Sequence, residues 1–103
     1  MKAARLYIEP EAEAELETTA DRYAESVPGL GLEFLGEMRK RTRDVLEHPE
    51  RFPWFAGVEG VRCAHAVGRF PHMVVYLVEG DSVHVLAYMH PRQRPGYWNH
   101  RLP

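Results

Sequence analysis

Histidine, arginine and aromatic residues gather near the end of this sequence, where an apolar run stops. The stretch VLAYMHPRQRPGYW carries His90, Arg92, Arg94, Tyr97 and Trp98. Histidine can exchange a proton near neutral pH, and arginine can hold the charge that develops on a phosphate. Tyrosine and tryptophan can stack on a base. Phosphate chemistry is therefore one interpretation of this stretch, and docking of an acidic peptide or capping of a strand end are the others.

Charge is distributed unevenly between the two halves of the chain. Residues 1–50 carry 12 acidic and 7 basic side chains, whereas residues 51–103 carry 3 acidic side chains and 6 arginines, with five of the six histidines. The planar guanidinium fork suits phosphate or carboxylate. The second half is thus a candidate anion-binding face, although a charge imbalance without function explains the pattern equally well.

Length and composition bound the class of protein. A chain of 103 residues with 45% hydrophobic side chains suits one domain, expected to span residues 1–103. The one cysteine, Cys63, allows no intrachain disulfide and is expected in the core. The N-terminus lacks a signal peptide, and no apolar run nears the roughly 20 residues of a membrane span, so we expect a cytoplasmic protein without membrane partners. Neither zinc-ligand spacing nor a phosphate loop is present, so we expect no metal and no small-molecule cofactor.

Periodicity predicts one strand, a helical hairpin and three further strands. Apolar residues from Ala12 to Val27 recur at helical spacing after Pro10, and Gly80-Asp81 is a strong hairpin signal. The predicted fold is α+β, with the helical hairpin on one face of a small, largely antiparallel sheet (β-α-α-β-β-β) and a short irregular C-terminal tail. The expected strands are 3–8, 61–67, 73–79 and 82–89, and the expected helices are 10–26 and 30–48.

The hairpin at Gly80-Asp81 sets a register that groups the residues of the last strand by face. With Glu79 opposite Ser82, regular pairing places Leu77 opposite His84 and Val75 opposite Leu86. Strict alternation then predicts two faces. The outward face would carry His84, Leu86, Tyr88 and His90, and the helix-packed face would carry Val83, Val85, Ala87 and Met89.

The same register predicts a polar site at one rim of the sheet. His90 and Arg92 would lie beside Arg69, and Arg62 would join them if its own register allows. Tyr97 and Trp98 would fold over the rim.

An apolar patch is expected on the outward face of the sheet. A patch of this kind on a soluble protein usually marks a partner site. The alternative is that the tail or the loop at 52–58 covers it. The residues assigned to this surface are Met73, Val75, Leu77, Leu86 and Tyr88.

Several segments together resemble the RelE/ParE superfamily of toxins from type II toxin–antitoxin systems, in particular its plasmid stabilization subgroup. They are EAEAELETTADRYAESVPGLGLEFLGEM, HPERFPWF and RFPHMVVYLVEGDSVHVLAYMHPRQRPGYW. The resemblance implies a toxin neutralised by a cognate antitoxin, whose C-terminal segment wraps the toxin. Its target would be DNA gyrase for a ParE-like member, or mRNA on the ribosome for a RelE-like endoribonuclease that needs no metal.

The resemblance also suggests roles for individual residues. In a nuclease, Arg69 would hold the scissile phosphate, His90 would be the general acid, Arg92 would hold a flanking phosphate, and Tyr97 would replace a C-terminal tyrosine. Target binding in either branch would fall to Arg62, Arg69, Arg92, Arg94 and Trp98.

The departures from the nuclease pattern weaken the nuclease interpretation without eliminating it. RelE-type sites rely on several lysines, whereas residues 51–103 contain none, and Pro91 follows His90 where certain nucleases carry tyrosine. We therefore favour a ParE-like gyrase inhibitor. A ribosome-dependent endoribonuclease and an inactive member retained for partner binding are the alternatives.

Overall fold

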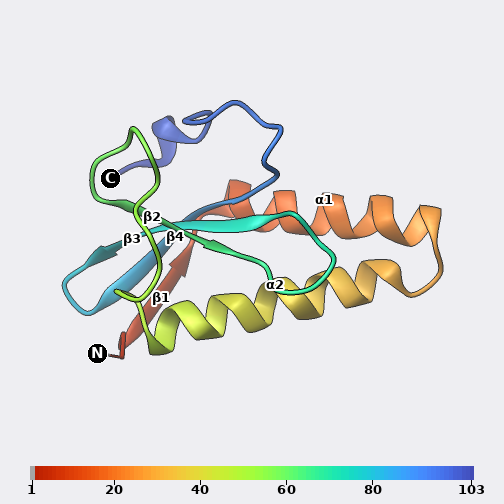
Figure 1. The fold of residues 1–103 in the computed structure, drawn as a ribbon, viewed down its shortest axis with the longest axis horizontal. Helices are drawn as coiled ribbons and strands as arrows, with labels where there is room; N and C mark the ends of the chain where they lie inside the picture. Colours follow the sequence, from red (N-terminus) through yellow and green to blue (C-terminus); the bar gives the residue numbers. More distant parts are fainter. Residues whose placement is uncertain (1) are drawn as a thin grey trace.

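The computed structural model, which describes residues 2–103, has two layers: a four-stranded sheet and a helical hairpin on one of its faces (Figure 1). The element order confirms the α+β fold and the β-α-α-β-β-β sequence of elements. The strands are β1 (Arg5–Ile8), β2 (Val61–His65), β3 (Met73–Glu79) and β4 (Ser82–Met89), and the helices are α1 (Pro10–Ser26), α2 (Leu30–Glu47) and the 3-10 turn η1 (Asn99–Arg101).

The sheet has the strand order β1-β4-β3-β2. β4 pairs antiparallel with β3 and parallel with β1, and β2 pairs antiparallel with β3. The bounds of α1, β3 and β4 match the sequence predictions. Three other elements are shorter than predicted. β1 begins at Arg5 instead of residue 3, α2 ends at Glu47 instead of residue 48, and β2 ends at His65 instead of residue 67.

The helical hairpin forms because its two helices carry apolar faces and a turn that can reverse the chain. Pro10 occupies the first turn of α1, where its missing N–H costs no hydrogen bond. Gly29 takes a φ of 84°, a left-handed conformation that favours glycine, and is the N-cap residue immediately before α2. Ala12, Leu16 and Ala20 of α1 are buried as predicted, whereas Val27 is half exposed beyond the end of the helix.

A β-bulge in β4 overturns part of the predicted register. Pairing runs as expected from Glu79–Ser82 to Tyr76–Val85, but Val75 then pairs with Ala87, so Leu86 is the extra residue. A single inserted residue turns every later side chain to the other face of the sheet. The predicted positions of Ala87, Tyr88 and Met89 were therefore wrong. Tyr88 packs with the core under the helices, and Ala87 and Met89 lie on the opposite face.

A second apolar core lies on the face of the sheet away from the helices. The loop at residues 49–60 and the C-terminal segment, which we define as residues 90–103, fold over this face (Figure 1). Trp98 is fully buried there and meets Phe55 edge to face, with ring centroids 5.2 Å apart. The outward face is thus covered by the chain itself, which was the alternative interpretation. Cys63 is buried in this second core, as expected.

Within residues 2–103, none of the helices combines the length and apolar character that crossing a bilayer requires.

Candidate functional site

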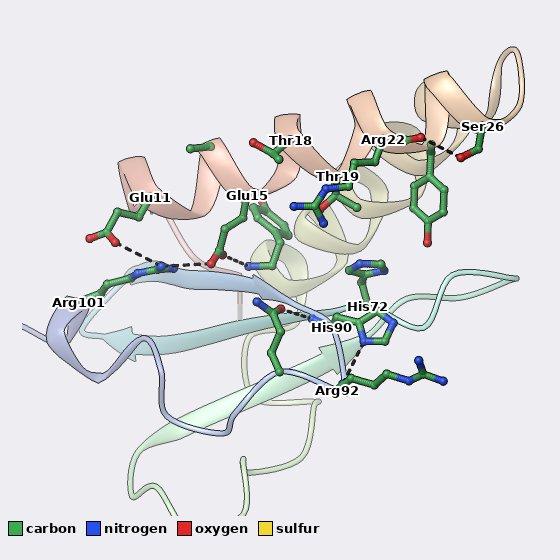
Figure 2. A pocket seen from close by; sticks show the side chains of 14 residues that line it. Glu11, Glu15, Thr18, Thr19, Arg22, Ser26, His72, His90, Arg92 and Arg101 are labelled. Carbon is green, nitrogen blue, oxygen red and sulfur yellow. Dashed lines mark hydrogen bonds and ion pairs between the residues drawn. The ribbon is translucent and has the colours of Figure 1, made fainter.

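A groove of about 780 Å³ separates α1 from the end of β4 and the C-terminal segment. Figure 2 shows α1 above the groove and His72, His90 and Arg92 below it. Its volume falls in the range typical of small-ligand sites. The groove is lined by Glu11, Ala14, Glu15, Thr18, Thr19, Arg22, Tyr23, Ser26, His72, Tyr88, His90, Arg92, Gln93 and Arg101.

The bulge explains why His90 faces this groove. The regular register placed His90 outward and opposite Pro71, whereas the shifted register carries it to the helix side, opposite His72. The two imidazole rings meet edge to face with centroids 5.0 Å apart. Bulges often re-aim a side chain at a functional position, and here the consequence is a histidine pair at one end of the groove.

His72 is the more deeply buried member of the pair. Its side chain packs against Phe34, with ring centroids 4.8 Å apart, and only 5% of the residue is exposed. Burial, together with the charge of His90, lowers the pKa of His72 from 6.5 to about 4. His72 is therefore neutral at pH 7, and its Nδ1 has no hydrogen-bond partner within the described part of the chain.

His90 is held by the start of the C-terminal segment. The backbone N–H of Arg92 donates to His90 Nδ1 over 3.0 Å, and the backbone N–H of His90 donates to Gln93 Oε1 over 2.7 Å. Because Nδ1 accepts a hydrogen bond, the neutral ring carries its proton on Nε2. The imidazole thus keeps one N–H donor for a ligand.

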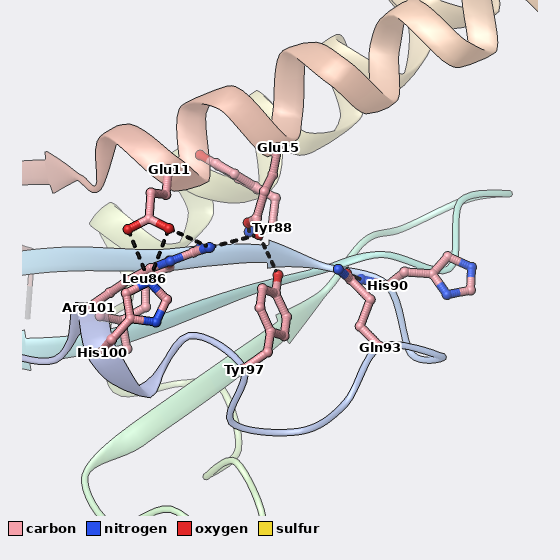
Figure 3. Close-up of polar contacts among 9 residues, drawn as sticks. All are labelled: Glu11, Glu15, Leu86, Tyr88, His90, Gln93, Tyr97, His100 and Arg101. Carbon is pink, nitrogen blue, oxygen red and sulfur yellow. Dashed lines mark hydrogen bonds and ion pairs between the residues drawn. The ribbon is translucent and has the colours of Figure 1, made fainter.

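The other end of the groove is a closed network between α1 and the C-terminal segment (Figure 3). Glu15 accepts hydrogen bonds from Tyr97 Oη (2.7 Å), Arg101 Nη2 (3.1 Å) and the backbone N–H of Tyr88 (3.2 Å). Arg101 Nη2 also lies 3.4 Å from Glu11 Oε2. Both carboxylates that line the groove are therefore neutralised by the chain itself.

Tyr97 acts as a hydrogen-bond donor in this network. Burial and its hydrogen bond to Glu15 raise the pKa of Tyr97 far above its ordinary value. The hydroxyl keeps its proton and points at a carboxylate, so it is poorly placed to act as a base. Its predicted role in place of a nuclease's C-terminal tyrosine stays a prediction.

Arg69 lies outside the groove, contrary to the predicted site. Its guanidinium forms an exposed ion pair with Glu33 at the start of α2 and lies 5.9 Å from the centroid of the Phe70 ring. Arg69 and His90 are both near the same end of the sheet, but Arg69 does not line the groove that His90 lines. The two residues thus do not share this groove, and their joint role in one site stays a prediction.

The remaining predicted target-binding residues are dispersed. Arg62 stacks on Trp54, with its guanidinium carbon 3.6 Å from the ring centroid, and donates to the carbonyl of Phe52. Trp98 is fully buried and offers no stacking surface, so that prediction was wrong for this structure. Arg92 lines the groove, and Arg94 is exposed outside it.

The expected antitoxin surface is covered in this structure. Met73, Val75, Leu77 and Leu86 lie in the second core with Trp98, and Tyr88 lies in the helix-side core. The Tyr88 hydroxyl meets Thr42 Oγ1 at 3.0 Å, and burial raises its pKa. The predicted exposure of all five residues was wrong, and their role in antitoxin binding stays a prediction.

Most of the groove residues were missed by sequence reasoning, among them His72 and Arg22. His72 was assigned no role, because the regular register placed His90 opposite its neighbour. Arg22 looked like an ordinary charged residue of α1, although it follows Glu15 by seven residues and Thr19 by three, a spacing that places all three on one helix face. Among the described residues, no group of three or more His, Cys, Asp or Glu side chains could hold a metal ion.

The architecture is that of a small α+β domain with a helical hairpin on one face of a four-stranded sheet. Residues 6–95 match the family model described as ParE toxin of type II toxin-antitoxin system, parDE. That match spans most of the sequence, so the chain belongs to this ParE toxin family and is the toxin component of a type II toxin–antitoxin system, with an antitoxin as its partner.

A solved structure has the same fold. A chain described as "Chromosomal ParDE TA system from P. aeruginosa" superposes with a TM-score of 0.73 and 19% sequence identity, covering 84% of this chain and 94% of that chain. Comparison with curated protein sequences gives no match.

Proposed function

We propose that this toxin acts by binding and inhibiting DNA gyrase rather than by cleaving RNA. The family match supports this target class. The observation that carries the proposal is the position of Arg69, whose guanidinium is paired with Glu33 on α2 while His90 lies in the groove under α1. A phosphate in the groove would meet His90 and Arg92 but not Arg69, to which the nuclease interpretation assigns the scissile phosphate.

The state of Tyr97 supports the same conclusion. Its hydroxyl is engaged by Glu15 and keeps its proton at physiological pH. The chain therefore offers His90 and Arg92 to a substrate, but no adjacent base among the residues predicted for catalysis. Inhibition by binding needs a complementary surface but no catalytic base. These residues can therefore support inhibition more readily than cleavage.

Expression of the toxin without its antitoxin tests this proposal. We expect growth arrest in which plasmid supercoiling fails before mRNA integrity does. Cleaved mRNA with normal DNA topology would instead support the ribosome-dependent endoribonuclease. Normal growth at high expression would support an inactive member retained for partner binding.

Variants of the two predicted catalytic residues sharpen this experiment. Under the gyrase proposal, Arg69→Ala should leave toxicity within a few-fold of the unmodified toxin, because Arg69 forms only an exposed ion pair. His90→Ala should likewise leave growth arrest in place. Loss of toxicity in both folded variants would contradict the proposal and favour the nuclease.

A further inference from the structure

The charges around the groove are not balanced along its length. Of the three arginines that line it, Arg101 is paired with Glu11 and Glu15. Within the described chain, Arg22 and Arg92 form no ion pair, and the two lining carboxylates are already engaged by Arg101, Tyr97 and His100. The end of the groove near the histidines therefore has two guanidinium groups without a counter-charge.

Polar groups converge on this same end. The histidine pair contributes the free Nε2–H of His90 and a buried His72 with an unpartnered Nδ1. Thr19 adds a half-buried hydroxyl from α1. Figure 2 shows Arg22 and Thr19 above His72, His90 and Arg92, on opposite sides of the groove. Donors from two separate elements thus surround one space.

We propose that the end of the groove between Arg22, His90 and Arg92 binds a phosphate group. This inference concerns binding alone and holds whether or not gyrase is the target of the toxin.

Phosphate suits the site better than a single carboxylate does. A phosphate monoester carries a charge of about −1.5 to −2 and three acceptor oxygens. Two guanidinium forks, an imidazole N–H and a hydroxyl can satisfy those oxygens together, whereas one carboxylate is saturated by a single arginine fork. Tyr23 also lines the groove, with its ring centroid 6.2 Å from that of His72.

Calorimetric titration of the toxin tests this site. The probes are inorganic phosphate, adenosine monophosphate and a short single-stranded RNA, each at low ionic strength. We expect saturable binding that Arg22→Gln and Arg92→Gln each weaken by about tenfold, since each removes a charge-assisted contact. Both side chains are exposed, so the variants should fold normally.

Two matched arginines control for general electrostatics. Arg43 on α2 and Arg51 in the loop at residues 49–60 are exposed and do not line the groove, so Arg43→Gln and Arg51→Gln should keep the unmodified affinity. RNA that binds about tenfold more tightly than the monophosphate would identify the nucleic-acid backbone as the source of the phosphate, and equal affinity would identify a free phosphate or nucleotide.

Three results would overturn the proposal. They are absence of saturable binding by all three probes, losses of equal size in the control variants, and binding of an acidic peptide in preference to every phosphate probe.

Discussion

Arg101 donates a hydrogen bond from Nη1 to the carbonyl oxygen of Leu86 over 2.9 Å. Leu86 is the residue that the bulge removes from the pairing of β4 with β3. The same guanidinium reaches Glu15 on α1 through Nη2, so one side chain joins the bulge, the helix and the C-terminal segment. Buried carbonyl groups require hydrogen-bond partners. Arg101 provides one for Leu86 and so links the C-terminal segment to the bulge in β4.

Removing this contact should loosen the C-terminal segment. We expect Arg101→Ala to lower the free energy of unfolding by about 2 kcal/mol, because it breaks a largely buried ion pair and a hydrogen bond. Urea denaturation followed by tryptophan fluorescence measures the change. Arg94→Ala is the matched control and should stay within about 0.5 kcal/mol of the unmodified protein. Equal stability of both variants would show that the contacts of Arg101 do not stabilise the fold.

The two tryptophans offer a direct test of the covered sheet face. Trp98 is fully buried in the second core, whereas Trp54 is 61% exposed. Trp98→Ala should cost about 3–5 kcal/mol through the cavity it leaves, and Trp54→Ala should cost at most about 1 kcal/mol for its stacking with Arg62. Thermal unfolding distinguishes them. A Trp98→Ala variant as stable as Trp54→Ala would mean that the C-terminal segment does not cover this face in solution.

Two glycines of α2 should respond in opposite directions to alanine. A Cβ at Gly31 would lie 2.4 Å from the carbonyl oxygen of Ala20 on α1, whereas a Cβ at Gly36 would meet nothing within 4 Å. Gly31→Ala should therefore destabilise the hairpin by about 1–3 kcal/mol through overpacking. Gly36→Ala should stabilise it by about 1 kcal/mol through helix propensity. Chemical denaturation measures the free energy of unfolding of both variants. A change of the same sign in both would contradict the close packing of Gly31 against α1.

Stability should depend on pH through His72. The folded pKa of about 4 lies below the ordinary value of 6.5, so between these values the unfolded chain binds more protons than the folded one. Stability contributed by the neutral ring is complete above pH 6.5 and is lost as the pH falls toward 4, by up to about 3 kcal/mol. Denaturation at pH 7 and pH 4 should show a smaller difference for His72→Phe than for the unmodified toxin. An unchanged difference would contradict the buried neutral state of His72.

The elements were predictable because their signals are local. Pro10, the Pro28-Gly29 turn and the Gly80-Asp81 hairpin each fix an element boundary through backbone geometry that the residue types dictate. The register failed at Leu86, since nothing in an apolar strand marks where an extra residue will be accommodated. One residue of error moved Tyr88 and His90 to the wrong face.

The site was less predictable than the fold because it depends on contacts between distant segments. Arg69 was placed correctly near the end of the sheet, but its partner Glu33 lies on α2, 36 positions away. Trp98 looked available for stacking, and only the packing of the C-terminal segment shows that it fills a core. His90 and Arg92 do line a groove together, as their proximity in the sequence suggested.

Supercoiling by purified DNA gyrase, measured on relaxed plasmid with the isolated toxin in excess, addresses the proposed function most directly. We expect supercoiling to be inhibited in proportion to toxin concentration and restored when the cognate antitoxin is added. His90→Ala and Arg69→Ala should inhibit as the unmodified toxin does. Undiminished supercoiling at excess folded toxin, with mRNA cleaved on ribosomes by the same preparation, would contradict a gyrase-directed mode of action.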